Sequence, residues 1–188
     1  MTTVDTPVGP SAVPVAHALR RLYLVRFAFA LVWAGLVFAT GARLGAPGIA
    51  LLVLYPLFDV AAAVVDVRAS RATTPSYGLY VNIVISLLAA VGLGVAGASG
   101  VPAVLVVWGA WAIVAGLVQL VVGVVRRPMG GQWPMILSGG LSVAVGTTFV
   151  LGASAPDPSL TTVAGYAVVG GVFFLVSALR LRRVTGER

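Results

Sequence analysis

The sequence predicts an all-α integral membrane protein with six transmembrane helices, arranged as three hairpins with both termini in the cytoplasm. Three observations favour this fold class. The chain contains six apolar runs of about 20 residues, and that length crosses a hydrocarbon core at 1.5 Å rise per residue. Only 9% of the 188 residues are charged and 60% are hydrophobic, whereas a soluble domain is about one-quarter charged. Nearly all arginines fall in every second gap between the runs.

The predicted membrane domain covers residues 20–183, between a disordered cytoplasmic tail at 1–19 and a short cytoplasmic tail at 184–188. Glycine and proline, which end helices, mark the breaks between the spans. In chain order the breaks contain Gly45 and Pro47, Pro75, Gly100 and Pro102, residues 126–131, and Pro156 with Pro158. The six predicted spans are 22–41, 47–67, 77–97, 102–124, 132–152 and 160–179.

The arginines predict the orientation of these spans. Eleven of them lie in the N-terminal tail and the entrance of the first span, in the second-to-third and fourth-to-fifth loops, or at the C-terminal end, and only Arg43 lies on the other side. Since arginine is retained in the cytoplasm, both termini are expected inside. The absence of lysine and the abundance of Ala, Val and Gly are typical of a high-GC bacterium, so we expect the bacterial cytoplasmic (inner) membrane.

The hairpins resemble one another at a period of about 55 residues. Residues 109–116 are similar to residues 165–171, and both helices end in paired arginines, at 126–127 and 182–183. The first hairpin fits this pattern more loosely. The spacing therefore predicts three parallel repeats with approximate threefold character, unlike the inverted pairs of many transporters.

Small residues recur on single helix faces and predict close helix packing, because lipid tails give helices no hydrophobic reason to associate. We expect these seams within the bundle or between copies of a homo-oligomer; the alternative is a narrow conduit lined by small side chains. The predicted packing glycines are Gly109, Gly116, Gly123, Gly139, Gly146 and Gly171.

Polar side chains lie in five of the six spans, and helix rise places most of them in the cytoplasmic half. They are Arg26, Asp59, Asp66, Asn82, Gln119 and Ser138. Charges at this depth are costly, by about 2.5–3.5 kcal/mol each, so each needs a reason. In a structural interpretation Arg26 pairs with Asp59 or Asp66, and Asn82 and Gln119 form interhelical hydrogen bonds. In a functional interpretation the residues line a pocket where Asp59 binds a proton or cation.

Several function classes are disfavoured by composition. The chain has no cysteine and one histidine, His17, so neither zinc sites of Cys and His nor a nucleophile–base pair is expected. We expect no catalytic residues, no metal, no cofactor and no nucleic-acid partner, because the arginines are spread over helix ends. The lipid bilayer is the expected partner. Trp33, Trp108, Trp111 and Trp133 are expected mostly near span ends, as interfacial anchors.

The pattern resembles the bacterial HdeD family, six-helix inner-membrane proteins built from a short-repeat domain of unknown function. The likeness is carried by Arg26 with Gly35, by residues 108–116, by residues 133–139 and by residues 165–180. It covers about residues 20–183 and is best over the second half. The resemblance implies a role in acid stress, and the family supplies no established active site to carry over. Asp59 and Asp66 depart from the family pattern.

Two functions follow as expectations. The first is a non-enzymatic, stress-associated or scaffolding membrane protein that acts through helix contacts. The alternative is a small transporter or channel for a proton, ion or small solute, with Asp59 as the site and Arg26 as the counter-charge.

Overall fold

The computed structural model describes residues 12–40, 44–70, 77–125 and 133–184, with the side chains of 12–16, 70 and 181–184 left out. These segments form six α-helices: α1 (Ala12–Ala39), α2 (Ala46–Ser70), α3 (Tyr77–Gly97), α4 (Val101–Val125), α5 (Trp133–Gly152) and α6 (Thr161–Val184). Each helix contains a stretch of 20 to 25 residues that is long and apolar enough to cross a membrane. The described part of the chain is therefore all helical, with six helices suited to span a bilayer.

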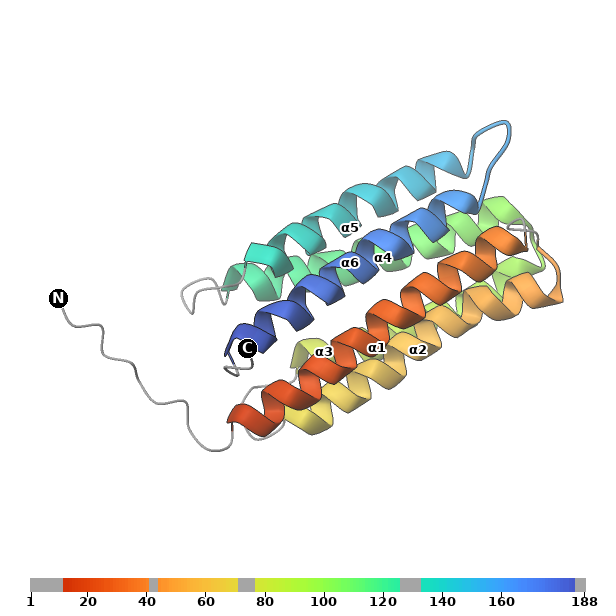
Figure 1. Cartoon of the computed structure of the whole chain (residues 1–188). Helices are drawn as coiled ribbons and strands as arrows, with labels where there is room; N and C mark the ends of the chain where they lie inside the picture. The colour runs from red at the N-terminus through yellow and green to blue at the C-terminus, as the bar shows by residue number, and fades with distance from the viewer. Residues whose placement is uncertain (1–11, 41–43, 71–76, 126–132, 185–188) are drawn as a thin grey trace, which may run out of the picture.

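The helices form a closed ring in chain order (Figure 1). Each helix packs against the next, and α6 returns to pack against α1. The contacts alternate in extent. The pairs α4–α5, α1–α6 and α2–α3 are extensively packed, whereas α3–α4, α1–α2 and α5–α6 touch progressively less. The ring thus consists of three tight pairs joined by three looser seams.

Both α1 and α6 have their terminal ends at the same end of the bundle (Figure 1). We call this the arginine-rich end, since Arg20, Arg21, Arg68 and Arg180 lie in the halves of their helices nearest to it. The connections α1–α2, α3–α4 and α5–α6 lie at the opposite end.

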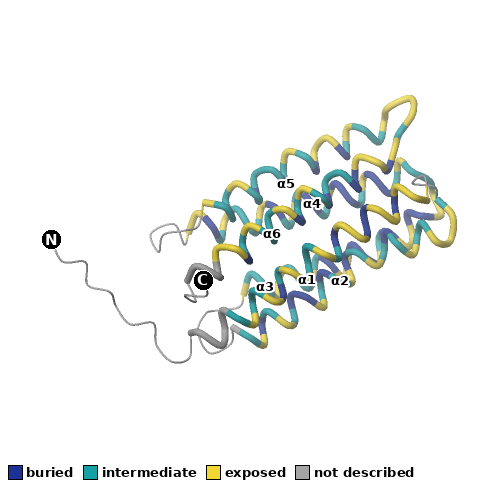
Figure 2. The backbone as a smooth tube through the Cα atoms, viewed as in Figure 1, coloured by how far each residue is buried: buried dark blue, intermediate teal, exposed yellow. Residues whose placement is uncertain are grey.

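Buried residues face the ring interior and the tight helix pairs, while the outward faces are exposed and apolar (Figure 2). Val32, Leu88, Val91 and Leu151 are each more than 60% exposed. Such a surface is unsuited to water and suited to lipid.

The observed helices match the predicted spans closely except at the N-terminus. The prediction of a disordered tail is wrong for residues 12–19, because α1 begins at Ala12. Alanine, leucine and arginine favour a helix, and Pro14 falls in the first turn, where its missing N–H is not needed. Residues 1–11 and 185–188 of the predicted tails lie outside the described residues.

Two prolines that mark predicted breaks stand in first helical turns. Pro47 and Pro102 each occupy the second position of a helix, where proline is tolerated, and Pro134, inside a predicted span, does so too. The turn between α3 and α4 depends on Gly100, whose φ of 103° is unfavourable for residues with a side chain. Pro56 lies inside α2.

The predicted packing glycines lie at two helix pairs. A Cβ on Gly109 would lie 2.6 Å from the carbonyl oxygen of Gly146, and one on Gly116 would lie 2.7 Å from that of Gly139. The reverse distances, from Gly146 and Gly139, are 2.7 and 2.8 Å. The backbones of α4 and α5 therefore touch directly, as small residues allow in membranes.

The remaining two glycines pack against side chains. A Cβ on Gly123 would lie 2.9 Å from the Ile136 side chain on α5, and one on Gly171 would lie 3.2 Å from the Cβ of Ala30 on α1. The small residues serve contacts within one chain.

Candidate functional site

A cavity of about 520 Å³ occupies the arginine-rich half of the ring interior. All six helices contribute to its wall. Along α2 the wall extends from Asp66 inward to Tyr55, about 16 Å at 1.5 Å rise per residue. Every residue of the predicted polar layer lines it, namely Arg26, Asp59, Asp66, Asn82, Gln119 and Ser138. The structure thus brings residues from five helices together around one space.

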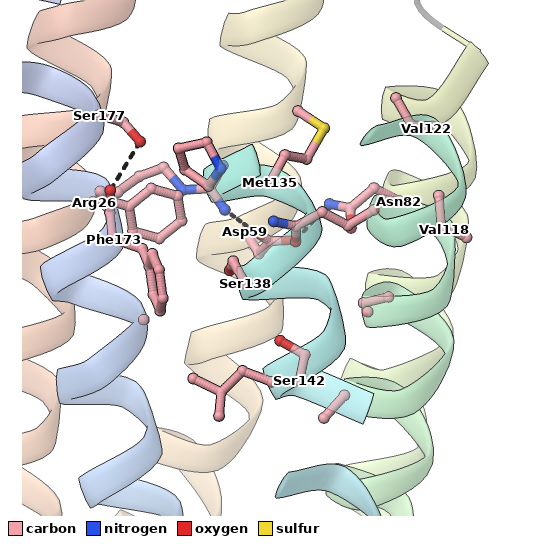
Figure 3. Close-up of a pocket in the computed structure, with 18 of the residues that line it drawn as sticks. Arg26, Asp59, Asn82, Val118, Val122, Met135, Ser138, Ser142, Phe173 and Ser177 are labelled. Atoms are coloured by element: carbon pink, nitrogen blue, oxygen red, sulfur yellow. Dashed lines mark hydrogen bonds and ion pairs between the residues drawn. The ribbon is translucent and has the colours of Figure 1, made fainter. Parts of the chain in front are cut away.

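The carboxylate of Asp59 is the centre of the polar wall. Arg26 on α1 forms an ion pair with Oδ1, through its Nη2. From α3, Asn82 Nδ2 donates to Oδ2 at 2.6 Å and Ser86 Oγ donates to the same oxygen at 2.9 Å. Arg26 and Asn82 approach Asp59 from opposite sides (Figure 3). Three donors suit an ionised carboxylate, which can only accept hydrogen bonds.

The network continues to two further helices. Trp111 on α4 donates its indole N–H to Ser86 Oγ at 3.1 Å. On the other side, the Arg26 guanidinium lies over the ring of Phe174 on α6, 4.2 Å from the centroid. A chain of polar and cation–π contacts therefore links α6, α1, α2, α3 and α4, in the order of the ring.

The seam between α5 and α6 is joined differently. Tyr166 on α6 donates its hydroxyl hydrogen bond to Ser142 Oγ on α5 at 2.8 Å, and its ring meets Phe149 edge-on at 5.7 Å. Toward the arginine-rich end, residues of both helices line the cavity, including Ser138 and Phe173 (Figure 3). The cavity therefore takes the place of direct packing along this part of the seam.

The other predicted polar residues occupy the wall around this network. Asp66 lies two turns nearer to the arginine-rich end of α2 than Asp59. Gln119 and Ser138 line the cavity from α4 and α5. Asp66, Gln119 and Ser138 therefore line the same cavity as Asp59 and add to its polar surface.

Sequence reasoning missed Ser86, Trp111, Ser142 and Tyr166. Ser86 follows Asn82 by four residues, so both lie on one face of α3, and this spacing was a usable signal. Ser142 likewise follows Ser138 by four residues. The partners Trp111 and Tyr166 had no such signal, because which side chain an aromatic residue meets depends on the ring order of the helices.

The far side of the cavity is closed by an aromatic core. Trp33 and Trp108 stack at 5.4 Å between ring centroids, and Tyr55 contacts both rings, at 4.7 and 5.6 Å. The expectation that these tryptophans act as interfacial anchors is wrong, since Trp33 is 1% exposed and Trp108 is fully buried. Both tryptophans lie on helix faces that point into the bundle, and this face, rather than the distance from the helix end, decides whether the side chain is buried. Trp133, by contrast, is 63% exposed.

The two buried indole nitrogens of this core differ in their hydrogen bonding. The indole N–H of Trp33 donates to the carbonyl oxygen of Leu51 at 2.6 Å, one turn before Pro56. Trp108 Nε1 is the one buried side-chain nitrogen or oxygen in the described segments without a hydrogen-bond partner. The half of the bundle opposite the arginine-rich end is therefore stabilised mainly by ring packing.

Within the described segments, no group of three or more His, Cys, Asp or Glu could hold a metal ion. No family model matches the chain, and neither a curated protein nor a solved structure matches it.

Proposed function

We propose that this chain is a non-enzymatic, multi-pass protein of the bacterial cytoplasmic membrane that binds a small solute or ion in the cavity around Asp59 and carries it across the bilayer. The observation that supports this is the cavity itself. Its volume of about 520 Å³ lies within the range of small-molecule sites, about 300–1,000 Å³. Its wall holds an ion pair whose Asp59 side chain is 12% exposed. Ionisable groups inside a membrane protein commonly mark a solute or ion path.

In the proposed orientation both termini and the mouth of the cavity face the cytoplasm. Eleven of the twelve arginines fall on that side in the sequence, as the positive-inside rule requires. The three-hairpin repeat is supported by the alternation around the ring, in which the looser pairs lie within the three hairpins and the tight pairs join one hairpin to the next.

A carrier fits this geometry better than a pore. The aromatic core around Trp33 and Trp108 fills the interior beyond the cavity, so a solute that reaches Asp59 needs a change of packing to leave on the other side. The loosest seam, between α5 and α6, offers the least resistance to such a change. In this proposal Asp59 holds the solute or ion and Arg26 is the counter-charge.

The Asp59 network favours a second function. This is a scaffolding or stress-associated role, like that implied by the resemblance to the HdeD family. Its three donors tie α1 and α3 to α2. In that case Asp59 stabilises the bundle and carries nothing.

An Asp59→Asn variant separates the two functions. In proteoliposomes, we expect the wild type to dissipate an imposed gradient of a proton, an inorganic cation or an organic cation, and Asp59→Asn to lose this flux while staying folded. Asp157→Asn, in the exposed connection between α5 and α6, is the matched control and should keep the flux. A wild type that passes nothing, with a variant that only unfolds at lower temperature, would favour the scaffold.

A further inference from the structure

The two carboxylate oxygens of Asp59 have different kinds of partner. Oδ2 accepts hydrogen bonds from two neutral side chains of one helix, Asn82 and Ser86 on α3. Oδ1 is occupied by a single cation, the guanidinium of Arg26. The neutral donors hold the carboxylate in place whether or not the cation is present. Oδ1 is therefore positioned to receive a positive charge from the cavity.

The guanidinium of Arg26 lies between this carboxylate and an aromatic face. Its centre is 4.2 Å from the Phe174 ring centroid, and the Tyr23 ring stacks with Phe174 at 6.1 Å between centroids. Aromatic faces bind quaternary ammonium ligands, and a carboxylate beside such a face adds the opposite charge. Arg26, Asp59, Phe174 and Tyr23 all line the cavity.

We propose that Arg26 is an internal occupant of an organic-cation site, and that the solute is a cation with an apolar, aromatic or alkyl body that displaces Arg26 from Asp59. This inference rests on the proposed function and names its substrate class. The solute charge takes the place of the guanidinium at Oδ1 and over Phe174. Arg26 sits on a long side chain near the arginine-rich end and is 15% exposed, so its head group can turn toward the cytoplasm.

The rest of the wall fits the body of such a solute. Tyr55, Trp111, Tyr166 and Phe173 present aromatic surface to the cavity. A bare inorganic cation gains little from such a wall, since it needs several oxygen ligands to replace its water. An apolar body gains by leaving water, while Asp59 receives the charge.

Competition between Arg26 and the solute gives the inference a measurable signature. The apparent affinity falls with the fraction of molecules in which Asp59 is free of Arg26. Removing the guanidinium should therefore tighten cation binding, whereas removing the carboxylate charge should weaken it. A purely structural ion pair predicts no binding in either case.

The test uses two probes of the same shape and opposite charge, tetraphenylphosphonium and tetraphenylborate, on the full chain in lipid nanodiscs by equilibrium dialysis. A Gly170→Phe variant measures how much probe dissolves in the lipid alone, because its phenyl group should fill the cavity. Gly170 lines the cavity, and a Cβ there meets nothing within 4 Å. Gly165→Phe is the matched control on the same helix, since Gly165 is equally open but not part of the wall.

We expect the phosphonium to bind the wild type and the Gly165→Phe variant but not Gly170→Phe. Arg26→Gln should bind it about tenfold more tightly and Asp59→Asn at least about tenfold more weakly. Where Arg26→Gln does not fold, Arg26→Lys should give a smaller gain, because lysine lacks the forked, planar group.

Equal or tighter binding of the borate, or weaker phosphonium binding in a folded Arg26→Gln protein, would overturn the cation assignment. Borate binding that Gly170→Phe removes would leave the proposed function standing with an anionic solute. No binding of the phosphonium to the wild type or to folded Arg26 variants would also overturn the assignment, and the flux assay would then decide the proposed function on its own.

Discussion

The two halves of the bundle consist of the same six apolar helices but differ in what fills their interior. In the half near the α1–α2, α3–α4 and α5–α6 connections, the interior is packed with Trp33, Trp108, Leu93 and Val163, all at most 1% exposed. In the arginine-rich half, the interior holds a cavity of about 520 Å³, and the hydrogen-bonded carboxylate of Asp59 lines it. Since lipid cannot drive helices together as water does, the helices need close packing or polar contacts to associate. The open half is held by the Asp59 network and by the close α4–α5 contacts at Gly116 and Gly123.

The largest expected difference between the halves concerns aromatic truncation. Trp108→Ala should lower the free energy of unfolding by about 3–5 kcal/mol, because it leaves a void among Trp33, Tyr55 and Trp111. Phe173→Ala, on the cavity wall, should cost less than about 1 kcal/mol. Reversible unfolding in mixed detergent micelles measures both. Equal costs would mean that the two halves are packed alike.

The next effect concerns the ion pair. Asp59→Leu should cost about 2–3 kcal/mol, because it leaves Arg26 and two neutral donors without their acceptor. The double variant Arg26→Met, Asp59→Leu should recover part of this loss, because no charge then lacks a counter-charge. The double-mutant cycle, by the same unfolding assay, gives the coupling. Additive losses would show that the pair does not hold the open half together.

A smaller effect is expected within the network. Ser86→Ala should cost about 1 kcal/mol, because Ser86 both donates to Asp59 and accepts from Trp111. Ser138→Ala, across the cavity on α5, is the matched control and should change stability by less than about 0.5 kcal/mol. Indole fluorescence of Trp111 should shift in Ser86→Ala alone. A Ser138→Ala variant as unstable as Ser86→Ala would place the stabilising contacts elsewhere.

The smallest effect is expected where the cavity itself is filled. Gly170→Leu should change the free energy of unfolding by less than about 0.5 kcal/mol, because its Cβ enters open space. Gly171→Leu, one residue further, should cost more than about 1 kcal/mol, since its Cβ would meet Ala30 at 3.2 Å. Thermal unfolding followed by circular dichroism compares the pair. If both variants lost stability equally, the cavity at Gly170 would not be open.

Much of this arrangement was predictable from the sequence, because the signals are local. Apolar run length predicted six helices, and the α3 bounds of 77–97 agree with the predicted span. Helix rise placed Arg26, Asp59 and Asn82 at similar depths, and they meet in the structure. The start of α1 was missed because the three prolines of the tail suggested disorder, although Pro14 suits a first helical turn.

What the sequence could not reveal depends on contacts between distant helices. Trp33 and Trp108 lie on different helices, and only the ring order of the bundle brings their faces together. Likewise, a pairing of Arg26 with Asp59 or with Asp66 was equally consistent with helix rise, since both aspartates share one face of α2. The structure pairs Arg26 with Asp59. The cavity too arises from the looseness of the α5–α6 seam, for which composition gives no sign.

The central claim is that the cavity extends from the cytoplasm to the level of Asp59. Cysteine labelling from each side of the membrane tests this claim most directly. The chain has no cysteine, so single introduced thiols have no background. A charged, membrane-impermeant thiol reagent should label Ser138→Cys in inside-out vesicles and not in right-side-out vesicles, and should leave Val163→Cys in the packed half unlabelled from either side. Labelling of Ser138→Cys from the outside, or from neither side, would contradict the account.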